Sequence, residues 1–114
     1  MAVIDTGIDI DHPEFEGNLW VNPVDGSHGF DFIENSNGLN RTTALDFHGT
    51  SVAGLIAARQ EGKGMTGVAP NVRVMDLRVF PTTGGASFGD IRNAIVFATQ
   101  NGADVINLSL GTNF

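Results

Sequence analysis

Two side chains have the types needed for proton transfer: the carboxylate of Asp5 and the imidazole of His48. His48 comes just before a run of small and aliphatic residues at positions 50–58, and this run predicts a buried helix. At the entrance of that helix, unpaired N–H groups and the positive end of the helix dipole disfavour an imidazolium, so we expect a neutral ring that can accept a proton. Asp5 would fix the tautomer of this ring and stabilise its charged form.

Hydrophobic runs predict the strands that must position this pair. Asp5 ends a run that starts at Met1, which predicts a central strand. Residues 72–79 are dense in Val, Met and Leu, as is typical of a strand buried on both faces, and residues 104–108 predict a further buried strand. An apolar segment at residues 29–33 predicts a short strand within an otherwise polar surface loop.

A second helix is predicted between the last two of these strands. Ser87 and Asp90 have the spacing of a capping box, and Gly102 is expected to end the helix. The apolar residues in between recur three and four positions apart, as on a helix face that packs on a sheet: Ile91, Ala94, Ile95 and Ala98. Strand, helix and strand of these lengths form a βαβ unit, so the sequence predicts an α/β fold with parallel strand pairing.

Five short motifs carry a resemblance to a known family. They are Val-Ile-Asp-Thr-Gly at residues 3–7, His-Pro-Glu at 12–14, His-Gly-Thr-Ser-Val-Ala-Gly at 48–54, Gly-Val-Ala-Pro at 67–70 and Val-Ile-Asn-Leu-Ser-Leu-Gly at 105–111. Their order and content resemble the subtilisin-like serine proteases (subtilases), and they cover nearly the whole chain. The resemblance implies the N-terminal portion of a subtilisin-like three-layer α/β fold with a mostly parallel sheet.

The same resemblance implies a serine endopeptidase that hydrolyses polypeptides through an acyl-enzyme. In it His48 would take the proton of the Ser and later protonate the leaving amine, and Asp5 would orient and electrostatically support His48. The family's nucleophilic Ser, in a Gly-Thr-Ser-x-Ala-x-Pro motif, and its oxyanion Asn do not occur in this sequence. Residues 1–114 are therefore expected to form a partial catalytic domain whose missing C-terminal half carries both groups. By itself the 114-residue chain is expected to lack efficient triad chemistry.

The resemblance also indicates residues that contact the substrate. Asp46 holds a position that often lines the cleft, although an acidic residue stabilising the helix N-terminus explains it equally well. A glycine-containing loop is expected to lie along an extended peptide, which would add to it as a strand: Gly84, Gly85 and Ala86. Backbone groups at the carboxyl end of the last strand are expected to contact substrate too: Leu108, Ser109, Leu110 and Gly111.

An acidic segment around His12 and Pro13 has two interpretations. It can be a solvated loop with a proline turn, or it can supply oxygen ligands to Ca²⁺, which prefers carboxylates and carbonyls. Resemblance supports the second, because many subtilases bind a structural calcium ion through the carboxylate after His-Pro. That carboxylate is Glu14 here, and Glu61 in the loop after the first helix is a further candidate ligand. The resemblance implies no cofactor for the chemistry itself.

Composition limits the possible classes of protein. With 114 residues, 41% of them hydrophobic and 17% charged, the chain is expected to be globular and to form one domain or less. A net charge of −7 argues against nucleic acid as a partner, and the absence of cysteine excludes disulfides and thiolate metal sites. No apolar run reaches the ~20 residues of a membrane span, and no signal peptide is visible. The family resemblance favours an extracellular protein.

Two other functions deserve comparison. Asp-Thr-Gly after two aliphatic residues also occurs in aspartic proteases, but that fold is all-β and leaves the helix after His48 unexplained. A non-catalytic fragment or relic of a subtilase is the other alternative, although it would not need both Asp5 and His48. Because residues 1–114 would leave an unpaired edge on a hydrophobic parallel sheet, we also expect the isolated chain to be poorly stable.

Overall fold

The computed structural model describes residues 1–41, 45–57 and 72–108 of the chain. In chain order its elements are β1 (Ala2–Asp5), the 3-10 turn η1 (Pro13–Phe15), β2 (Gly29–Asp31), α1 (Phe47–Ala57), β3 (Met75–Arg78), α2 (Phe88–Gln100) and β4 (Ile106–Leu108). Neither helix in this part of the chain is long and apolar enough to cross a lipid bilayer.

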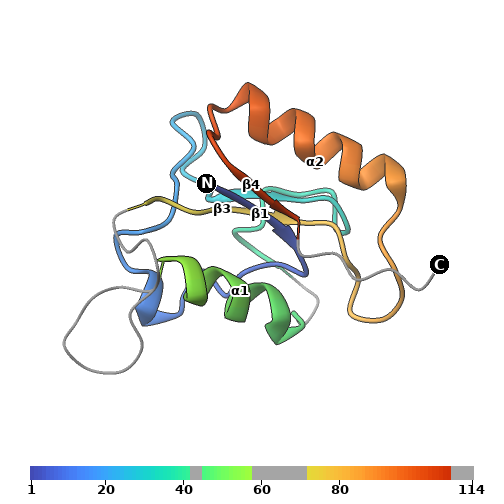
Figure 1. The fold of residues 1–114 in the computed structure, drawn as a ribbon, viewed down its shortest axis with the longest axis horizontal. Coiled ribbons are helices and arrows are strands. Elements are labelled where there is room, and N and C mark those ends of the chain that lie inside the picture. The colour runs from blue at the N-terminus through green and yellow to red at the C-terminus, as the bar shows by residue number, and fades with distance from the viewer. Residues whose placement is uncertain (42–44, 58–71, 109–114) are drawn as a thin grey trace.

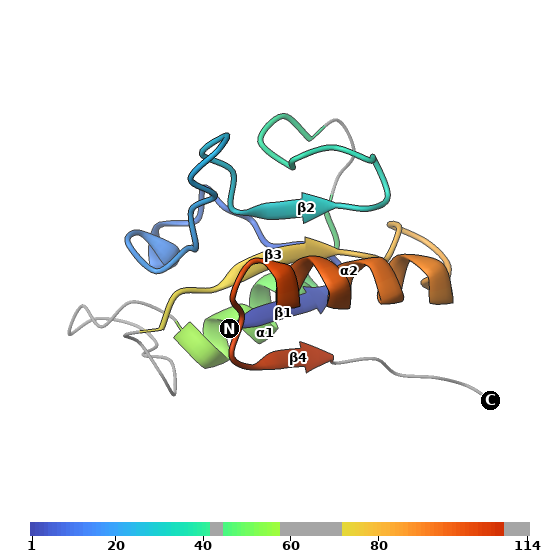
Figure 2. The ribbon, with the colours of Figure 1, turned by 90° about the horizontal axis from the view of Figure 1, so that it is seen from above.

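The strands form one sheet in which every described pairing is parallel. Its strand order is β2-β3-β1-β4, so β1 lies between β3 and β4 although it comes first in the sequence. Figure 2 shows the four arrows running in the same direction. The carboxyl ends of all the strands therefore share one edge of the sheet, and Asp5 lies at that edge, paired in register with Arg78.

The helices lie on opposite faces of the sheet, α1 on one and α2 on the other (Figure 1). Successive side chains of β1 point to opposite faces, as in any strand. Ala2 and Ile4 join a core with Ala94 and Ala98 of α2, whereas Val3 joins a second core under α1. This arrangement confirms the predicted three-layer α/β fold, and it is incompatible with the all-β fold of an aspartic protease.

Helix α2 has the ends that its sequence predicts. Ser87 is the N-cap, and its hydroxyl accepts a hydrogen bond of 3.1 Å from the backbone N–H of Asp90. At the other end, Gly102 has a φ of +82°, and the N–H groups of Gly102 and Ala103 bond back to the carbonyls of Thr99 and Ala98. This is the Schellman arrangement, which stops a helix at a glycine.

Two expectations need correction. The strand predicted at residues 104–108 is not buried, because β4 lies at the end of the strand order, where Val105 is 51% and Leu108 43% exposed. The first helix begins at Phe47 and not at residue 50, so His48 lies in its first turn. Residues 72–79 and 29–33 do contain the predicted strands, each somewhat shorter than expected.

Candidate active site

Asp5 ends β1 with its carboxylate turned toward α1. Its side chain is 2% exposed, and its Oδ1 accepts two hydrogen bonds, 2.7 Å from the N–H of Thr6 and 2.8 Å from ring Nδ1 of His48. The second oxygen, Oδ2, is buried and has no hydrogen-bond partner among the described residues. A buried carboxylate this close to the ring favours the tautomer with its proton on Nδ1.

His48 presents the rest of its ring to solvent. The side chain is 52% exposed, and Nε2 has no hydrogen-bond partner in the described part of the chain. The backbone N–H of His48 donates a 2.8 Å bond to the carboxylate of Asp46, which thereby caps the N-terminus of α1. The ring is thus oriented on one side by Asp5 and open on the other for exchange of a proton.

A close contact between the turn after β1 and the start of α1 sets the distance between Asp5 and His48. The hydroxyl of Thr6 accepts a 2.8 Å hydrogen bond from the N–H of Gly49 and donates a 3.2 Å bond to the carbonyl of Asp46. A side chain at Gly49 would collide with the backbone oxygen of Gly7, so only glycine allows this approach. Sequence reasoning missed these roles of Thr6 and Gly49, whose only signals were their places beside Asp5 and His48.

Electrostatics at the pair differ from the sequence-based expectation. The hydrogen bond to Asp5 and the charge of that carboxylate raise the pKa of His48 above its ordinary value of 6.5, against a smaller opposing effect of burial. Asp46 raises it further by its charge. The expectation that the helix N-terminus keeps the ring neutral is therefore wrong in its direction, because a carboxylate in direct contact outweighs the partial charge of the helix end.

Known proteins resemble this chain over nearly its whole length. The sequence model described as the subtilase family matches residues 1–114. The chain belongs to the subtilase family. Its similarity to individual subtilases is also high: it is 40% identical over 112 residues to the thermophilic serine proteinase of Bacillus sp. (strain AK1) and 39% identical over 111 residues to subtilisin DY of Bacillus licheniformis.

The chain spans only part of these relatives. Each of the two alignments covers 97% of this chain, but 25% of the thermophilic proteinase and 36% of subtilisin DY. A third relative, the minor extracellular protease Vpr of Bacillus subtilis (strain 168), is 36% identical over 121 residues, which cover 99% of this chain and 14% of Vpr.

Several residues predicted to contact substrate lie at the same sheet edge as Asp5. Gly84 and Gly85 are exposed in the loop that connects β3 to α2, Ala86 in the same loop is half-buried, and Leu108 ends β4. The carboxyl ends of parallel strands bring these segments to one edge (Figure 2). Ser109, Leu110 and Gly111 lie outside the described residues. Substrate contact by any of them stays a prediction.

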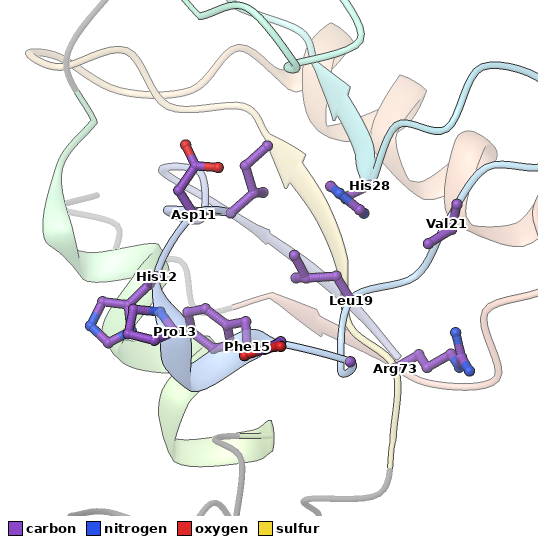
Figure 3. Close-up of a pocket in the computed structure, with 11 residues that line it drawn as sticks. Asp11, His12, Pro13, Phe15, Leu19, Val21, His28 and Arg73 are labelled. Atoms are coloured by element: carbon purple, nitrogen blue, oxygen red, sulfur yellow. The ribbon is translucent and has the colours of Figure 1, made fainter.

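Asp46 lines a groove at the start of α1, in addition to capping that helix. The groove has a volume of about 500 Å³ and is lined by Asp9, His12, Leu45, Asp46, Phe47 and Thr50. A second pocket of about 420 Å³, shown in Figure 3, lies around η1 with Phe15, Leu19 and Arg73 in its wall. Neither Asp5 nor His48 lines either of these two hollows. The groove at the start of α1 includes Asp46 and Phe47, the two residues that precede His48 in the chain, whereas the second pocket includes neither.

Glu14, the predicted calcium ligand, lies in η1. The backbone N–H of Glu14 donates a 3.1 Å hydrogen bond to Nδ1 of His12, which caps the turn. Oε2 of Glu14 is buried and finds no hydrogen-bond partner among the described residues. Residues 1–41, 45–57 and 72–108 contain no cluster of three metal-ligating side chains, and Glu61 lies outside them.

Proposed function

We propose that this chain is the part of a subtilisin-type serine endopeptidase that carries its general base, His48, and the carboxylate that supports it, Asp5. The observation that supports this most directly is the 2.8 Å contact between the buried carboxylate of Asp5 and Nδ1 of His48. Membership of the subtilase family supports the reaction class. The nucleophilic Ser and the oxyanion Asn would come from a C-terminal portion of the protein that follows residue 114.

In this mechanism His48 is the general base and Asp5 its electrostatic support. Nε2 of His48 takes the proton of the Ser hydroxyl as the oxygen attacks the peptide carbonyl, and it later gives that proton to the leaving amine. The imidazolium formed in between is stabilised by the charge of Asp5, which itself stays ionised. The exposure of the ring's outer side suits this role, because the substrate and the Ser must both reach Nε2.

The substrate in this proposal is an extended polypeptide. Gly84 and Gly85 have no side chains to obstruct a peptide backbone, and they lie in an exposed loop at the sheet edge where Asp5 ends β1. A peptide that pairs with this loop would place its scissile bond toward His48. Asp46 would contribute from the other side, through the groove that it lines.

A labelling experiment tests the proposal. The full-length gene product and the 114-residue chain would each be assayed with a fluorogenic peptide and an active-site phosphonate. We expect a labelled Ser and peptide hydrolysis only in the full-length product, loss of activity in His48→Ala, and no loss in Ser51→Ala, which alters an exposed hydroxyl on the same helix. A folded full-length product with no activity and no label would instead indicate a non-catalytic relative.

We also propose that the protein binds a structural Ca²⁺ ion through Glu14 while needing no cofactor for its chemistry. The buried Oε2 of Glu14, which lacks a partner among the described residues, supports this. Treating the full-length protein with EDTA should lower its melting temperature by several degrees, since a bound ion stabilises only the folded state. Glu14→Gln should remove most of this effect. An EDTA effect that persists in Glu14→Gln would contradict the assignment.

Export from the cell is the last part of the proposal. One relative, Vpr, is named as an extracellular protease, and a net charge of −7 with no cysteine is compatible with an extracellular enzyme. Peptidase activity in the culture medium of the source organism, lost when the gene is deleted, is the expected result. Retention of the protein inside the cell would contradict it.

A further inference from the structure

Four charged side chains form a buried network next to β1. They are Asp31 at the end of β2, Arg41 in the loop that follows, and Asp76 and Arg78 on β3. Arg41 Nε lies 2.9 Å from Asp31 Oδ2, Arg41 Nη2 lies 2.6 Å from Asp76 Oδ2, and Arg78 Nη1 lies 3.1 Å from Asp31 Oδ2. The most exposed of the four, Arg41, has a side chain that is only 9% exposed.

Stability alone is a poor explanation for such a network. Burial raises the pKa of Asp76, against the opposing effect of Arg41, which reflects how costly it is to desolvate this carboxylate. Burial acts to lower the pKa of Arg41, but Asp76 and Asp31 outweigh it and raise that pKa, so the guanidinium stays charged. Buried ion networks can often be replaced by apolar side chains without loss of stability. What apolar side chains would not supply is directional hydrogen bonding.

The directional bonds of this network converge on Ile8, three residues after Asp5. The backbone N–H of Ile8 donates a 3.0 Å bond to Oδ1 of Asp76, and its carbonyl accepts a 2.9 Å bond from Nη1 of Arg41. Both polar backbone atoms of Ile8 are thus held by the network. The planar fork of a guanidinium suits this geometry, because Arg41 binds Ile8, Asp31 and Asp76 at the same time.

Ile8 is one end of a short segment whose other end is Asp5. The sheet holds Asp5, whose carbonyl accepts a 2.9 Å bond from the N–H of Val79. Between these two anchors lie Thr6, which bonds Gly49 at the start of α1, and Gly7, whose φ of +100° needs glycine. A shift of Ile8 would therefore move Thr6, and with it the start of α1 that carries His48, relative to the anchored Asp5.

We propose that Arg41 and Asp76 are positioning residues for the Asp5–His48 pair: they hold Ile8 from both sides, so that the segment after Asp5 keeps its contacts with α1. The consequence for catalysis rests on the proposed peptidase function, whereas the effect on the His48 ring does not. The ring is a sensitive reporter because two carboxylates act on it, Asp5 from β1 and Asp46 from the start of its own helix.

The test compares two charge-neutral double variants of the full-length protein. Arg41→Gln with Asp76→Asn removes the two side chains that hold Ile8, and this pair of changes is called the clamp variant. Arg92→Gln with Asp104→Asn makes the same change in charge at exposed sites and is called the surface variant. The pKa of His48 is measured by NMR titration of the histidine rings, alongside kcat and KM. In the clamp variant we expect that pKa to fall by about one unit and kcat to fall about 10- to 100-fold at nearly constant KM. The surface variant should match the wild type.

A single variant, Arg41→Lys, keeps the experiment decisive if the double variant does not fold. Lysine keeps the charge but cannot bind three acceptors in one plane, so the pKa of His48 should fall in the same direction by a smaller amount. An unchanged His48 pKa in either folded clamp variant, with only the melting temperature lowered, would overturn the proposal. A wild-type protein without peptidase activity would refute the proposed function, while the pKa comparison would still decide the role of Arg41 and Asp76.

Discussion

At the scale of single residues, the pair of Asp5 and His48 shows which of two electrostatic effects dominates. A helix N-terminus disfavours a cation by about 0.3–1 kcal/mol at exposed sites. A carboxylate within hydrogen-bond distance typically shifts a pKa by one to three units, and each unit corresponds to about 1.4 kcal/mol. The direct contact is thus the larger effect, and His48 binds its proton more tightly than a free histidine.

This pKa predicts the pH dependence of the complete enzyme. His48 must lose its proton to act as a base, so the acid limb of kcat/KM should lie above pH 6.5, the ordinary pKa of histidine. Asp5→Asn should move that limb to lower pH and reduce kcat by about 10⁴-fold, whereas Asp104→Asn at an exposed site should change neither. A pH–rate profile of the three proteins is the measurement, and an acid limb that Asp5→Asn leaves in place would contradict the assignment.

The raised pKa of His48 also predicts how the free energy of unfolding changes with pH. Because the pKa of His48 is raised in the folded state, the stabilisation it provides is fully present below pH 6.5 and is lost as the pH rises through the raised value. The free energy of unfolding should therefore fall more over that window in the wild type than in His48→Gln. We expect a small difference, because half of the ring is exposed to solvent. Denaturant melts at several pH values measure it.

Gly49 offers a second test at the residue scale. A methyl group there would meet the backbone of Gly7, which cannot move aside as a flexible side chain can. Gly49→Ala should lower the free energy of unfolding by about 1–3 kcal/mol and lower the pKa of His48 as α1 is pushed away from Asp5. Gly89→Ala is a matched control, since nothing lies within 4 Å of that position and α2 should gain stability. Equal free energies of unfolding for the two variants would contradict the close approach of Gly49 to Gly7.

At the scale of elements, the two helices depend on different kinds of information. Helix α2 has an N-cap at Ser87, an apolar stripe and a terminating Gly102, so its sequence specifies its limits locally. Helix α1 starts earlier than its apolar run, because Asp46 caps it and the hydroxyl of Thr6, which follows β1, accepts a hydrogen bond from the N–H of Gly49. Local signals are enough for the first helix to be located, but not for its beginning to be placed.

The N-cap of α2 can be tested directly. Ser87→Ala removes the acceptor for the N–H of Asp90 and should lower the free energy of unfolding by about 1 kcal/mol. Ser51→Ala, at an exposed position within α1, should be neutral or slightly stabilising because alanine favours helix more than serine does. Denaturant unfolding of both variants gives the comparison, and a Ser87→Ala protein as stable as the wild type would show that the cap contributes nothing.

At the scale of the whole molecule, β1 is an inner strand of the sheet that the described residues form, and β4 is an outermost strand at one edge of that sheet. Val105 and Leu108 are about half exposed there, and an exposed apolar strand edge is a template for pairing with another chain. The expected low stability of the isolated chain is in line with this edge, although it stays a prediction. A cooperative guanidinium melt with the midpoint of an ordinary small domain would contradict it.

A charged side chain beside β4 should reduce self-association of the 114-residue chain. Val105→Lys introduces a charge that opposes pairing with another strand, so light scattering of concentrated samples should fall. Val24→Lys is the control, because Val24 is 91% exposed in a loop and belongs to no strand. Equal scattering from the two variants would indicate that β4 is not the surface that associates.

Features that depend on local patterns could be predicted from the amino-acid sequence. Hydrophobic runs located the strands, the capping and stripe signals located α2, and the motif at residues 3–7 with that at 48–54 indicated the pair that the fold brings together. These predictions succeeded because caps, turns and apolar faces act within a few residues of the chain. The family resemblance of the same short motifs indicated the reaction class, that of a serine-type peptidase.

Three further features depend on how distant parts of the chain come together in the fold. The burial of β4 depends on the strand order, which places β1 between β3 and β4. The pKa of His48 depends on a carboxylate 43 residues away in the sequence. The network that holds Ile8 joins Arg41 to Asp76 across 35 residues and Arg78 to Asp31 across 47. Each depends on which distant residues become neighbours, and neither composition nor local spacing encodes that.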